Sequence, residues 1–219
     1  MGKVRQGRGF KEVFMKEDAQ KVKVNRRPHI KSVSKETAYL ALGVAILTVC
    51  AWITIPFGTI PVTLQTFAVA LIGALFGAAR GVAVILTYFI MGLIGIPVFS
   101  SFNAGVAALL GSTGGYLIGF VFSVVPVGLF SIIPVKNRVA KTAIVYVGAV
   151  LGMAICYFFG TLWFITVYNR GSAEAVSVAA ALGFCVVPFL LPDAVKLFFG
   201  VLLGVRLKGA VKLGKGKVT

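Results

Sequence analysis

The stretch LPDAVKLFFGVLLGV, residues 191–205, places two charged residues, Asp193 and Lys196, in an otherwise apolar run. Their i, i+3 spacing puts both on one face of a helix, about one turn apart. A carboxylate accepts from N–H groups and an ammonium donates to a carbonyl, which suits a compact polar ligand such as a urea or an amide. The alternative is an internal ion pair that only neutralises itself. Because charges in a membrane segment are costly and usually functional, we favour the ligand site.

The composition of the chain is that of a membrane protein rather than a water-soluble domain. Of its 219 residues, 58% are hydrophobic and only 13% are charged, and the mean hydropathy is +0.97. A hydrocarbon core about 30 Å thick requires roughly 20 apolar helical residues for each crossing. We therefore expect an all-α integral membrane protein, a bundle of six transmembrane helices. The expected helices cover residues 37–53, 64–76, 82–94, 115–133, 142–167 and a last segment that ends near Val205.

The positive charges predict how this bundle is oriented. The formal net charge is +16, and eleven Lys or Arg residues precede residue 36. Others lie at Arg80, within VKNRVAK (135–141) and from Arg206 onward, which all fall on the same side of a six-helix bundle. The positive-inside rule places both termini in the cytoplasm, with the chain multi-pass in the inner (plasma) membrane. The basic tails favour membrane lipid over nucleic acid as a partner. The expected parts are a basic cytoplasmic extension (1–36), the transmembrane domain (37–206) and a basic cytoplasmic tail (207–219).

Several chemistries are excluded by the residue types. Cys50, Cys156 and Cys185 lie in or beside apolar segments without C-x-x-C spacing, so we expect neither disulfides nor metal ligands. The glycine-rich stretch GSTGGYLIG lacks the Gly-Lys-Ser/Thr of a phosphate-binding loop, so this chain does not hydrolyse ATP by that route. The sequence contains no pattern that suggests catalysis. It therefore predicts a protein that is not an enzyme and binds no cofactor or metal itself.

The remaining polar residues lie on the uncharged side, in loops that contain prolines. Three Ile-Pro steps, at Pro56, Pro61 and Pro97, each favour an extended residue before the ring and end a helix. The segment GIPVFSSFNAGVAALLGSTGG (95–115) is too long for a tight turn and too apolar for a solvated loop. Such a segment at membrane depth is stable only when it packs on protein or covers a cavity. We expect it to be a lid over the site of the two charges.

Four stretches of the sequence resemble one known family. They are IPFGTIPVTLQTFAVALIGALFGAARG, GLIGIPVFSSFNAG, GSTGGYLIGF and LPDAVK, in this order across roughly residues 37–206. Together they resemble BioY, the biotin-specific substrate-binding component of energy-coupling factor transporters. The resemblance implies a six-helix subunit that binds biotin in an outward-facing pocket. It also implies a separate transmembrane coupling subunit and two ATPase subunits, which hydrolyse ATP while this chain topples in the membrane to release the vitamin inside.

The resemblance also implies which residues bind the ligand. Asp193 and Lys196 match the ligand-contacting aspartate and lysine of the family's last helix, and Asn103 matches an asparagine after its third helix. We expect Asp193 to accept from a ureido N–H of biotin and Asn103 to meet the remaining ureido edge. Lys196 would meet either the ureido oxygen or the carboxylate. The apolar walls would come from aromatic residues, chiefly Phe99, Phe102 and Tyr116, with Trp163 as a further candidate.

Ala41 and Ala45 form a small-residue face on the first helix. Residues of this kind let helices approach closely in lipid, and internal packing explains them as well as a docking surface does. Members of the resembled family dock on their coupling subunit through such a stripe, which favours docking. The alternative function is a stand-alone secondary transporter of another small solute, which needs a driving-ion site. Asp193 is the one carboxylate expected within the membrane, so the sequence gives no indication of such a site.

Overall fold

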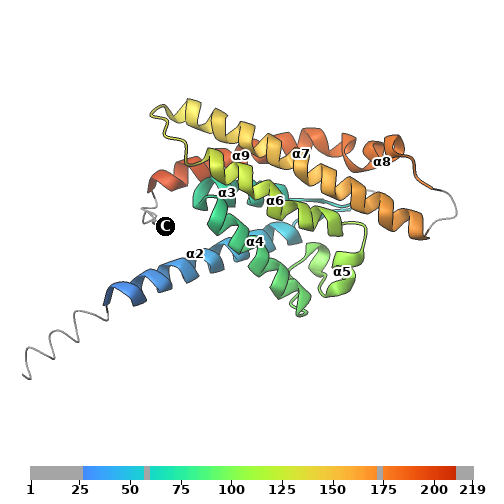
Figure 1. Ribbon diagram of the computed structural model, residues 1–219, viewed down its shortest axis with the longest axis horizontal. Helices are drawn as coiled ribbons and strands as arrows, with labels where there is room; N and C mark the ends of the chain where they lie inside the picture. Colours follow the sequence, from blue (N-terminus) through green and yellow to red (C-terminus); the bar gives the residue numbers. More distant parts are fainter. Residues whose placement is uncertain (1–26, 57–59, 172–174, 211–219) are drawn as a thin grey trace, which may run out of the picture. The chain divides into compact units, whose positions relative to one another are not determined.

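Figure 1 shows the computed structural model, which describes residues 27–56, 60–171 and 175–210. These residues divide into two units, one up to Tyr39 and one from Leu40 onward, and the second unit carries the helical bundle. Two short antiparallel strands, β1 (Thr54–Ile55) and β2 (Val62–Thr63), form a hairpin. Apart from this hairpin, the expectation of an all-α chain is confirmed.

The described elements are mostly apolar helices. Three helical stretches are long and apolar enough to cross a membrane, residues 35–52, 138–170 and 178–209, and three more apolar helices are shorter. They agree with the membrane protein that the composition predicts. The α-helices are α2 (Arg27–Trp52), α3 (Gln65–Phe76), α4 (Ala78–Leu93), α5 (Val106–Leu110), α6 (Gly114–Phe130), α7 (Arg138–Gly171), α8 (Val178–Cys185) and α9 (Leu190–Ala210), and the 3₁₀ turns are η1 (Ser100–Phe102) and η2 (Val187–Phe189).

Three elements differ from the predicted segments. Helix α2 begins at Arg27 rather than near residue 37, since Pro28 sits in its first turn, where proline is tolerated, and no further proline follows until Pro56. Helix α7 has 34 residues because no proline interrupts it. The last segment, for which only an end near Val205 was predicted, contains two helices, α8 and α9, separated by η2 with Pro188. The lid segment also contains a short helix, α5, that was not predicted.

The bundle is held together by close helix pairs. Helix α6 packs along α7, and α3 packs along α9. A Cβ placed on Gly119 of α6 would lie 2.9 Å from the Cα of Cys156 in α7. A Cβ on Gly200 of α9 would lie 2.6 Å from the backbone oxygen of Phe67 in α3. Glycine thus brings these helices nearer than any side chain allows, which is how helices associate in lipid.

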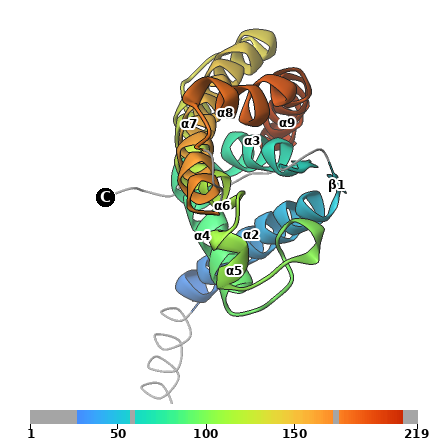
Figure 2. The same ribbon diagram turned by 90° about the vertical axis from the view of Figure 1, so that its right-hand side faces the viewer.

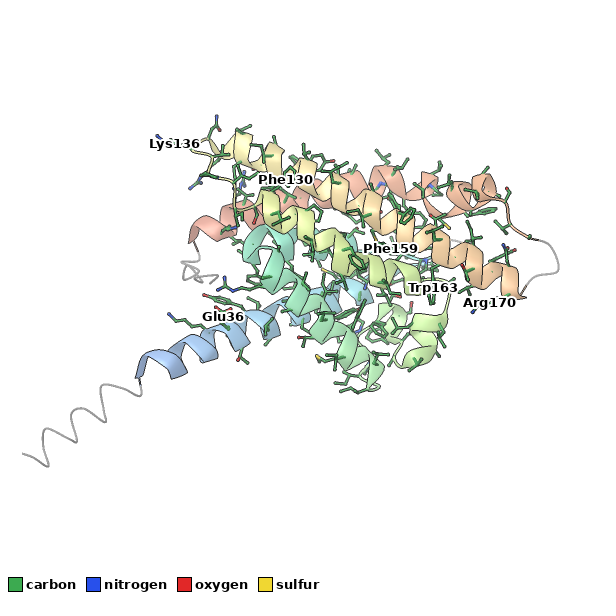
Figure 3. The ribbon with its side chains drawn as sticks, in the orientation of Figure 1. Glu36, Phe130, Lys136, Phe159, Trp163 and Arg170 are labelled. Atoms are coloured by element: carbon green, nitrogen blue, oxygen red, sulfur yellow. The ribbon has the colours of Figure 1, made fainter. Side chains whose placement is uncertain are left out.

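One end of the bundle carries a group of basic side chains. Lys208, near the end of α9, donates to the backbone oxygen of Ser131 at 3.1 Å and to its hydroxyl at 3.0 Å. Lys141 donates to the backbone oxygen of Ile133. Lys208 therefore caps the carboxyl end of α6, and Lys141 contacts the loop that follows it. Arg80 in the first turn of α4 belongs to the same end, where Gly128 packs on Ala78. Figure 3 labels Lys136 at this end of α7 and Arg170 at the other.

The opposite end of the bundle holds the shorter elements. It contains the hairpin, the lid segment with α5, the starts of α6 and α9, and α8. Figure 2, turned by 90°, shows α5 on the side of α2 and α4, and α8 on the side of α7 and α9. The two short elements therefore flank the same end of the bundle from different sides.

We predict that Gly200→Leu destabilises the bundle, because its side chain would meet the α3 backbone. Overpacking of this kind costs about 1–3 kcal/mol in free energy of unfolding. The melting temperature in detergent measures it. Gly183→Leu is the matched control, since a Cβ on Gly183 in α8 meets no atom within 4 Å. Equal melting temperatures for the two variants would contradict a close contact between α3 and α9.

Candidate ligand-binding site

The lid end of the bundle contains a cavity of about 370 Å³. Its wall is formed by the start of α3, the lid segment, α6, α7 and the start of α9. Ligand cavities measure roughly 300–1,000 Å³, so this volume suits one small molecule. The polar side chains of the wall include those of Thr63, Gln65, Thr66, Asn103, Tyr157, Asp193 and Lys196.

The carboxylate of the site stands at the start of a helix. Pro188 in η2 ends the preceding turn, and α9 begins at Leu190, with Pro192 in its first turn, where a missing N–H costs nothing. Asp193 also lies in this first turn. A carboxylate at a helix amino end is stabilised by the unpaired backbone N–H groups and the helix dipole. The break between α8 and α9 thus favours a charge at this position.

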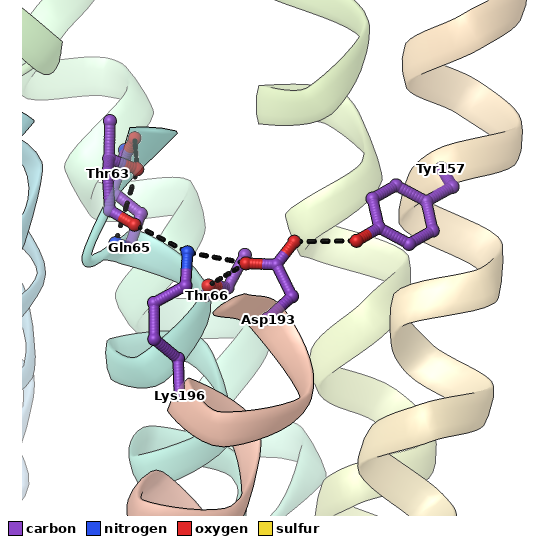
Figure 4. Close-up of polar contacts among 6 residues, drawn as sticks. All are labelled: Thr63, Gln65, Thr66, Tyr157, Asp193 and Lys196. Carbon is purple, nitrogen blue, oxygen red and sulfur yellow. Dashed lines mark hydrogen bonds and ion pairs between the residues drawn. The ribbon is translucent and has the colours of Figure 1, made fainter. Parts of the chain in front are cut away.

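Asp193 is almost completely buried, with 3% of its surface exposed, and three side chains satisfy it (Figure 4). Oδ1 is ion-paired with Lys196 and accepts from the Thr66 hydroxyl at 3.0 Å. Oδ2 accepts from the Tyr157 hydroxyl at 2.7 Å. A carboxylate has about four lone-pair sites, so Oδ2 has room for one more donor. Asp193 is therefore held as a fixed acceptor that faces the cavity.

Lys196 is held in a similar way. Besides Asp193, it donates to the backbone oxygen of Thr63 at 2.8 Å, at the end of strand β2 (Figure 4). An ammonium has three N–H donors, and these two contacts with described residues use two of them. The pair therefore presents one acceptor and one donor side by side. This pattern complements the N–H and C=O groups of an amide or a urea.

The geometry has features of both interpretations of the charged pair, the ligand site and the internal ion pair. Asp193 and Lys196 do neutralise each other, as expected for an internal ion pair. Both nevertheless line the cavity, and each retains hydrogen-bonding capacity toward it. The same geometry therefore suits both a structural ion pair and a ligand contact.

The lid segment is held by aromatic donors from three helices. The indole of Trp52 in α2 donates to the backbone oxygen of Pro97 at 2.9 Å. The hydroxyl of Tyr88 in α4 donates to the backbone oxygen of Val98 at 2.9 Å. The indole of Trp163, labelled in Figure 3, donates from α7 to the backbone oxygen of Gly111 at 3.0 Å. The segment is thus fixed near both of its ends, with its middle part along the cavity.

The structure brings most of the predicted site residues together. Asn103, Phe99 and Tyr116 line the cavity with Asp193 and Lys196. The amide of Asn103 donates to the backbone oxygen of Ser100 at 3.0 Å. The hydroxyl of Tyr116 donates to the backbone oxygen of Cys185 at 2.9 Å.

Two predicted aromatic residues lie outside the cavity wall. Phe102 is 61% exposed and its ring stacks on Trp52, with centroids 4.9 Å apart. Its direction follows from the backbone, because Ser101 and Phe102 have φ of 56° and 60°. Trp163 does not line the cavity either, and contacts the lid through Gly111 instead.

Four polar residues of the site were not predicted as site residues from the sequence. Thr63, Gln65 and Thr66 belong to IPVTLQT, where three polar side chains within four positions at the start of an apolar helix are a readable sign of a polar site. Tyr157 gives no such sign, because it lies among other aromatic residues of α7. Only the fold brings its hydroxyl to Asp193.

The remaining predicted positions lie away from the cavity. Ala41 and Ala45 are exposed on α2. The three cysteines are free and buried. Within the described ranges, no three His, Cys, Asp or Glu residues come together as a metal site would require.

Comparisons with known proteins identify relatives of this chain. A profile of the BioY family matches residues 18–213. The "Probable biotin transporter BioY" of Pyrococcus horikoshii is 35% identical over 176 residues, which cover 80% of this chain and 98% of that protein. The "Biotin transporter BioY" of Thermotoga maritima is 36% identical over 164 residues, or 75% of this chain and 90% of that protein.

A solved structure is also similar. It is described as the S-component for biotin from an ECF-type ABC transporter, and it matches with a TM-score of 0.70 and 25% identity over 82% of this chain and 93% of that chain. The curated relatives are named as transporters, in agreement with the expectation that this chain is not an enzyme. The family profile spans most of the sequence, and the relatives align over nearly their whole length. The chain therefore belongs to the BioY family.

Proposed function

We propose that this chain is the substrate-binding subunit of an energy-coupling factor transporter and that its ligand is biotin. The observation that carries the proposal is the Asp193–Lys196 pair on the cavity wall, where contacts with described residues leave one acceptor position and one N–H donor unused. The names of the relatives and of the similar solved structure support biotin as the ligand.

The ureido ring of biotin fits the free hydrogen-bonding positions. One ureido N–H donates to Oδ2 of Asp193, and the ureido oxygen accepts the third N–H of Lys196. Asn103 meets the remaining ureido edge from the lid. Phe99 and Tyr116 supply the apolar wall for the thiophane ring and the chain, while Phe102 takes no part because it lies outside the cavity. A ligand without these groups leaves buried polar atoms unpaired, at about 1–3 kcal/mol each.

The proposed orientation has both termini in the cytoplasm, six transmembrane helices and a cavity that opens to the outside of the inner (plasma) membrane. The charge distribution supports it, because Lys141 and Lys208 lie at the end of the bundle opposite the cavity. Residues 1–36 and 207–219 are proposed as basic cytoplasmic segments that contact anionic lipid and not nucleic acid.

The proposed partners are a transmembrane coupling subunit and two ATPase subunits, which bind and hydrolyse the ATP. Ala41 and Ala45, exposed on α2, are the proposed docking face. A subunit that rotates in lipid needs a smooth surface, because large side chains or buried hydrogen bonds would fix one orientation. This chain itself binds neither a cofactor nor a metal in the proposal.

We predict that Asp193→Asn weakens biotin binding to the purified protein at least about tenfold, or about 1.4 kcal/mol. The amide keeps the shape but replaces a charged acceptor by a weaker one, and its single NH2 group must face either Lys196 or Tyr157, both of which are donors. Isothermal titration in detergent measures it, with size-exclusion chromatography to verify folding.

Tyr168→Phe is the control for this variant, since Tyr168 is exposed on α7 and does not line the cavity. Unchanged affinity in folded Asp193→Asn would favour the self-neutralising ion pair. Absence of biotin binding to the wild-type protein would refute the proposed ligand. Biotin uptake without an ATPase module would instead favour a stand-alone secondary transporter.

A second experiment distinguishes the two possible partners of Lys196. If it meets the ureido oxygen, Lys196→Gln weakens biotin and biotin methyl ester by the same factor, because the ester retains the ureido ring. If it meets the carboxylate, the wild-type protein already discriminates strongly against the ester, and Lys196→Gln removes that discrimination. Competition against radiolabelled biotin measures both ligands on both proteins, and we expect the first result.

For the coupling face, we predict that Ala45→Trp and Ala41→Trp leave biotin affinity within about twofold of wild type and abolish co-purification with the coupling module and uptake. Leu162→Trp is the matched control, because Leu162 is 50% exposed on α7, so a tryptophan there adds bulk to another exposed surface. Normal transport by the alanine variants would refute the docking face. Loss of biotin binding would identify these positions as internal packing instead.

A further inference from the structure

We propose that Tyr88 is a positioning residue that, together with Gln65, joins the charged pair to the lid. The inference rests on the proposed function, because it concerns how the same cavity holds its ligand. Tyr88 is completely buried in α4 and does not line the cavity. It can therefore affect a ligand only through the residues that it touches.

A continuous series of hydrogen bonds runs from Lys196 to the lid. Lys196 donates to the backbone oxygen of Thr63 at 2.8 Å, and the Thr63 hydroxyl donates to Oε1 of Gln65 at 3.0 Å. Nε2 of Gln65 donates to the Tyr88 hydroxyl at 3.0 Å, which in turn donates to the backbone oxygen of Val98 at 2.9 Å. Figure 4 shows the part between Lys196 and Gln65.

The donor directions in this series are fixed. The Tyr88 hydroxyl has one proton and gives it to Val98, so it must accept from Gln65. The Gln65 amide then presents its oxygen to Thr63, which must donate. Gln65 is only 4% exposed and its bond to Tyr88 is buried, so water does not readily replace that bond. A buried series of this kind holds one arrangement, because any reversal leaves a polar atom unpaired.

The lid backbone beside Val98 depends on such support. Ser101 and Phe102 have left-handed φ values of 56° and 60°, a conformation that costs energy in residues other than glycine and persists only where the surroundings hold it. The turn is closed by a bond of 3.1 Å from the Phe99 N–H to the backbone oxygen of Asn103. This turn presents Asn103 to the cavity.

Phe99, at the start of this turn, is packed by the same tyrosine. Its ring meets Tyr88 edge-on, with centroids 5.4 Å apart. The ring also lies so close to Gly92 of α4 that a Cβ there would clash with it. The hydroxyl and ring of Tyr88 thus fix two successive lid residues, Val98 and Phe99. Asn103 is positioned through them.

The test is a double-mutant cycle between Tyr88→Phe and Asn103→Ala, with biotin affinity as the readout. Tyr88→Phe keeps the ring against Phe99 and removes the hydroxyl alone. We expect it to weaken binding about fivefold in the wild-type background and to have no further effect in Asn103→Ala, because the ring of the variant still packs on Phe99 and the polar side chain positioned through the hydroxyl is already absent. An equal loss in both backgrounds would overturn the proposal, and so would no loss in the wild type.

Hydrogen–deuterium exchange of the ligand-free protein separates this inference from the proposed function. We expect Tyr88→Phe to accelerate exchange over residues 98–105 about tenfold and to leave residues 106–113, held by Trp163, unchanged. Trp163→Phe should give the reverse pattern, and Tyr168→Phe neither. Gln65→Met is the second variant, and it should accelerate the same 98–105 stretch if Tyr88→Phe does not fold. Unchanged exchange there would refute positioning, whereas failure of the wild type to bind biotin refutes the ligand alone.

Discussion

The structure depends on one buried ion pair in an apolar bundle. The Asp193 carboxylate has 3% of its surface exposed, and it is stable in such surroundings only if hydrogen bonds and a cation satisfy the oxygens that face the protein. Lys196 comes from the same helix, Thr66 from α3 and Tyr157 from α7, while Thr63 of the hairpin holds the ammonium. Four separate elements must meet at one point to satisfy these two charges, and the cavity is the space that remains between them. Stability and the proposed ligand recognition therefore depend on the same atoms.

Much of this site follows from local patterns in the sequence. The i, i+3 spacing places Asp193 and Lys196 on one face of a helix, and the apolar length and proline content of residues 95–115 predict a segment packed on protein. The partners of the pair could not be read in the same way. Tyr157 is 36 residues from Asp193 and Thr66 is 127 residues away, so their contacts depend on which helices are neighbours. Phe102 shows the same limit, because two left-handed residues decide which way its ring points.

The helix boundaries also show where apolar periodicity ceases to be informative. Helix α7, with 34 residues, is about 51 Å long at 1.5 Å per residue, well beyond a hydrocarbon core of about 30 Å. Helix α3, with 12 residues, is too short to span that core. Length therefore follows from where breakers such as Pro188 stand and not from membrane thickness. The break at Pro188 places Asp193 at the amino end of a helix. The helix break, which apolar periodicity alone does not predict, therefore helps to form the site.

The protein has two tryptophans, and each donates an indole hydrogen bond to a backbone oxygen of the lid, Trp52 near its beginning and Trp163 near its end. Tryptophan dominates the near-ultraviolet emission of a protein, and its wavelength depends on the polarity around the indole. The tryptophan fluorescence of this chain therefore originates at the two ends of the lid. Any rearrangement of that segment alters the emission without a label, which makes the unmodified protein its own optical sensor of lid position.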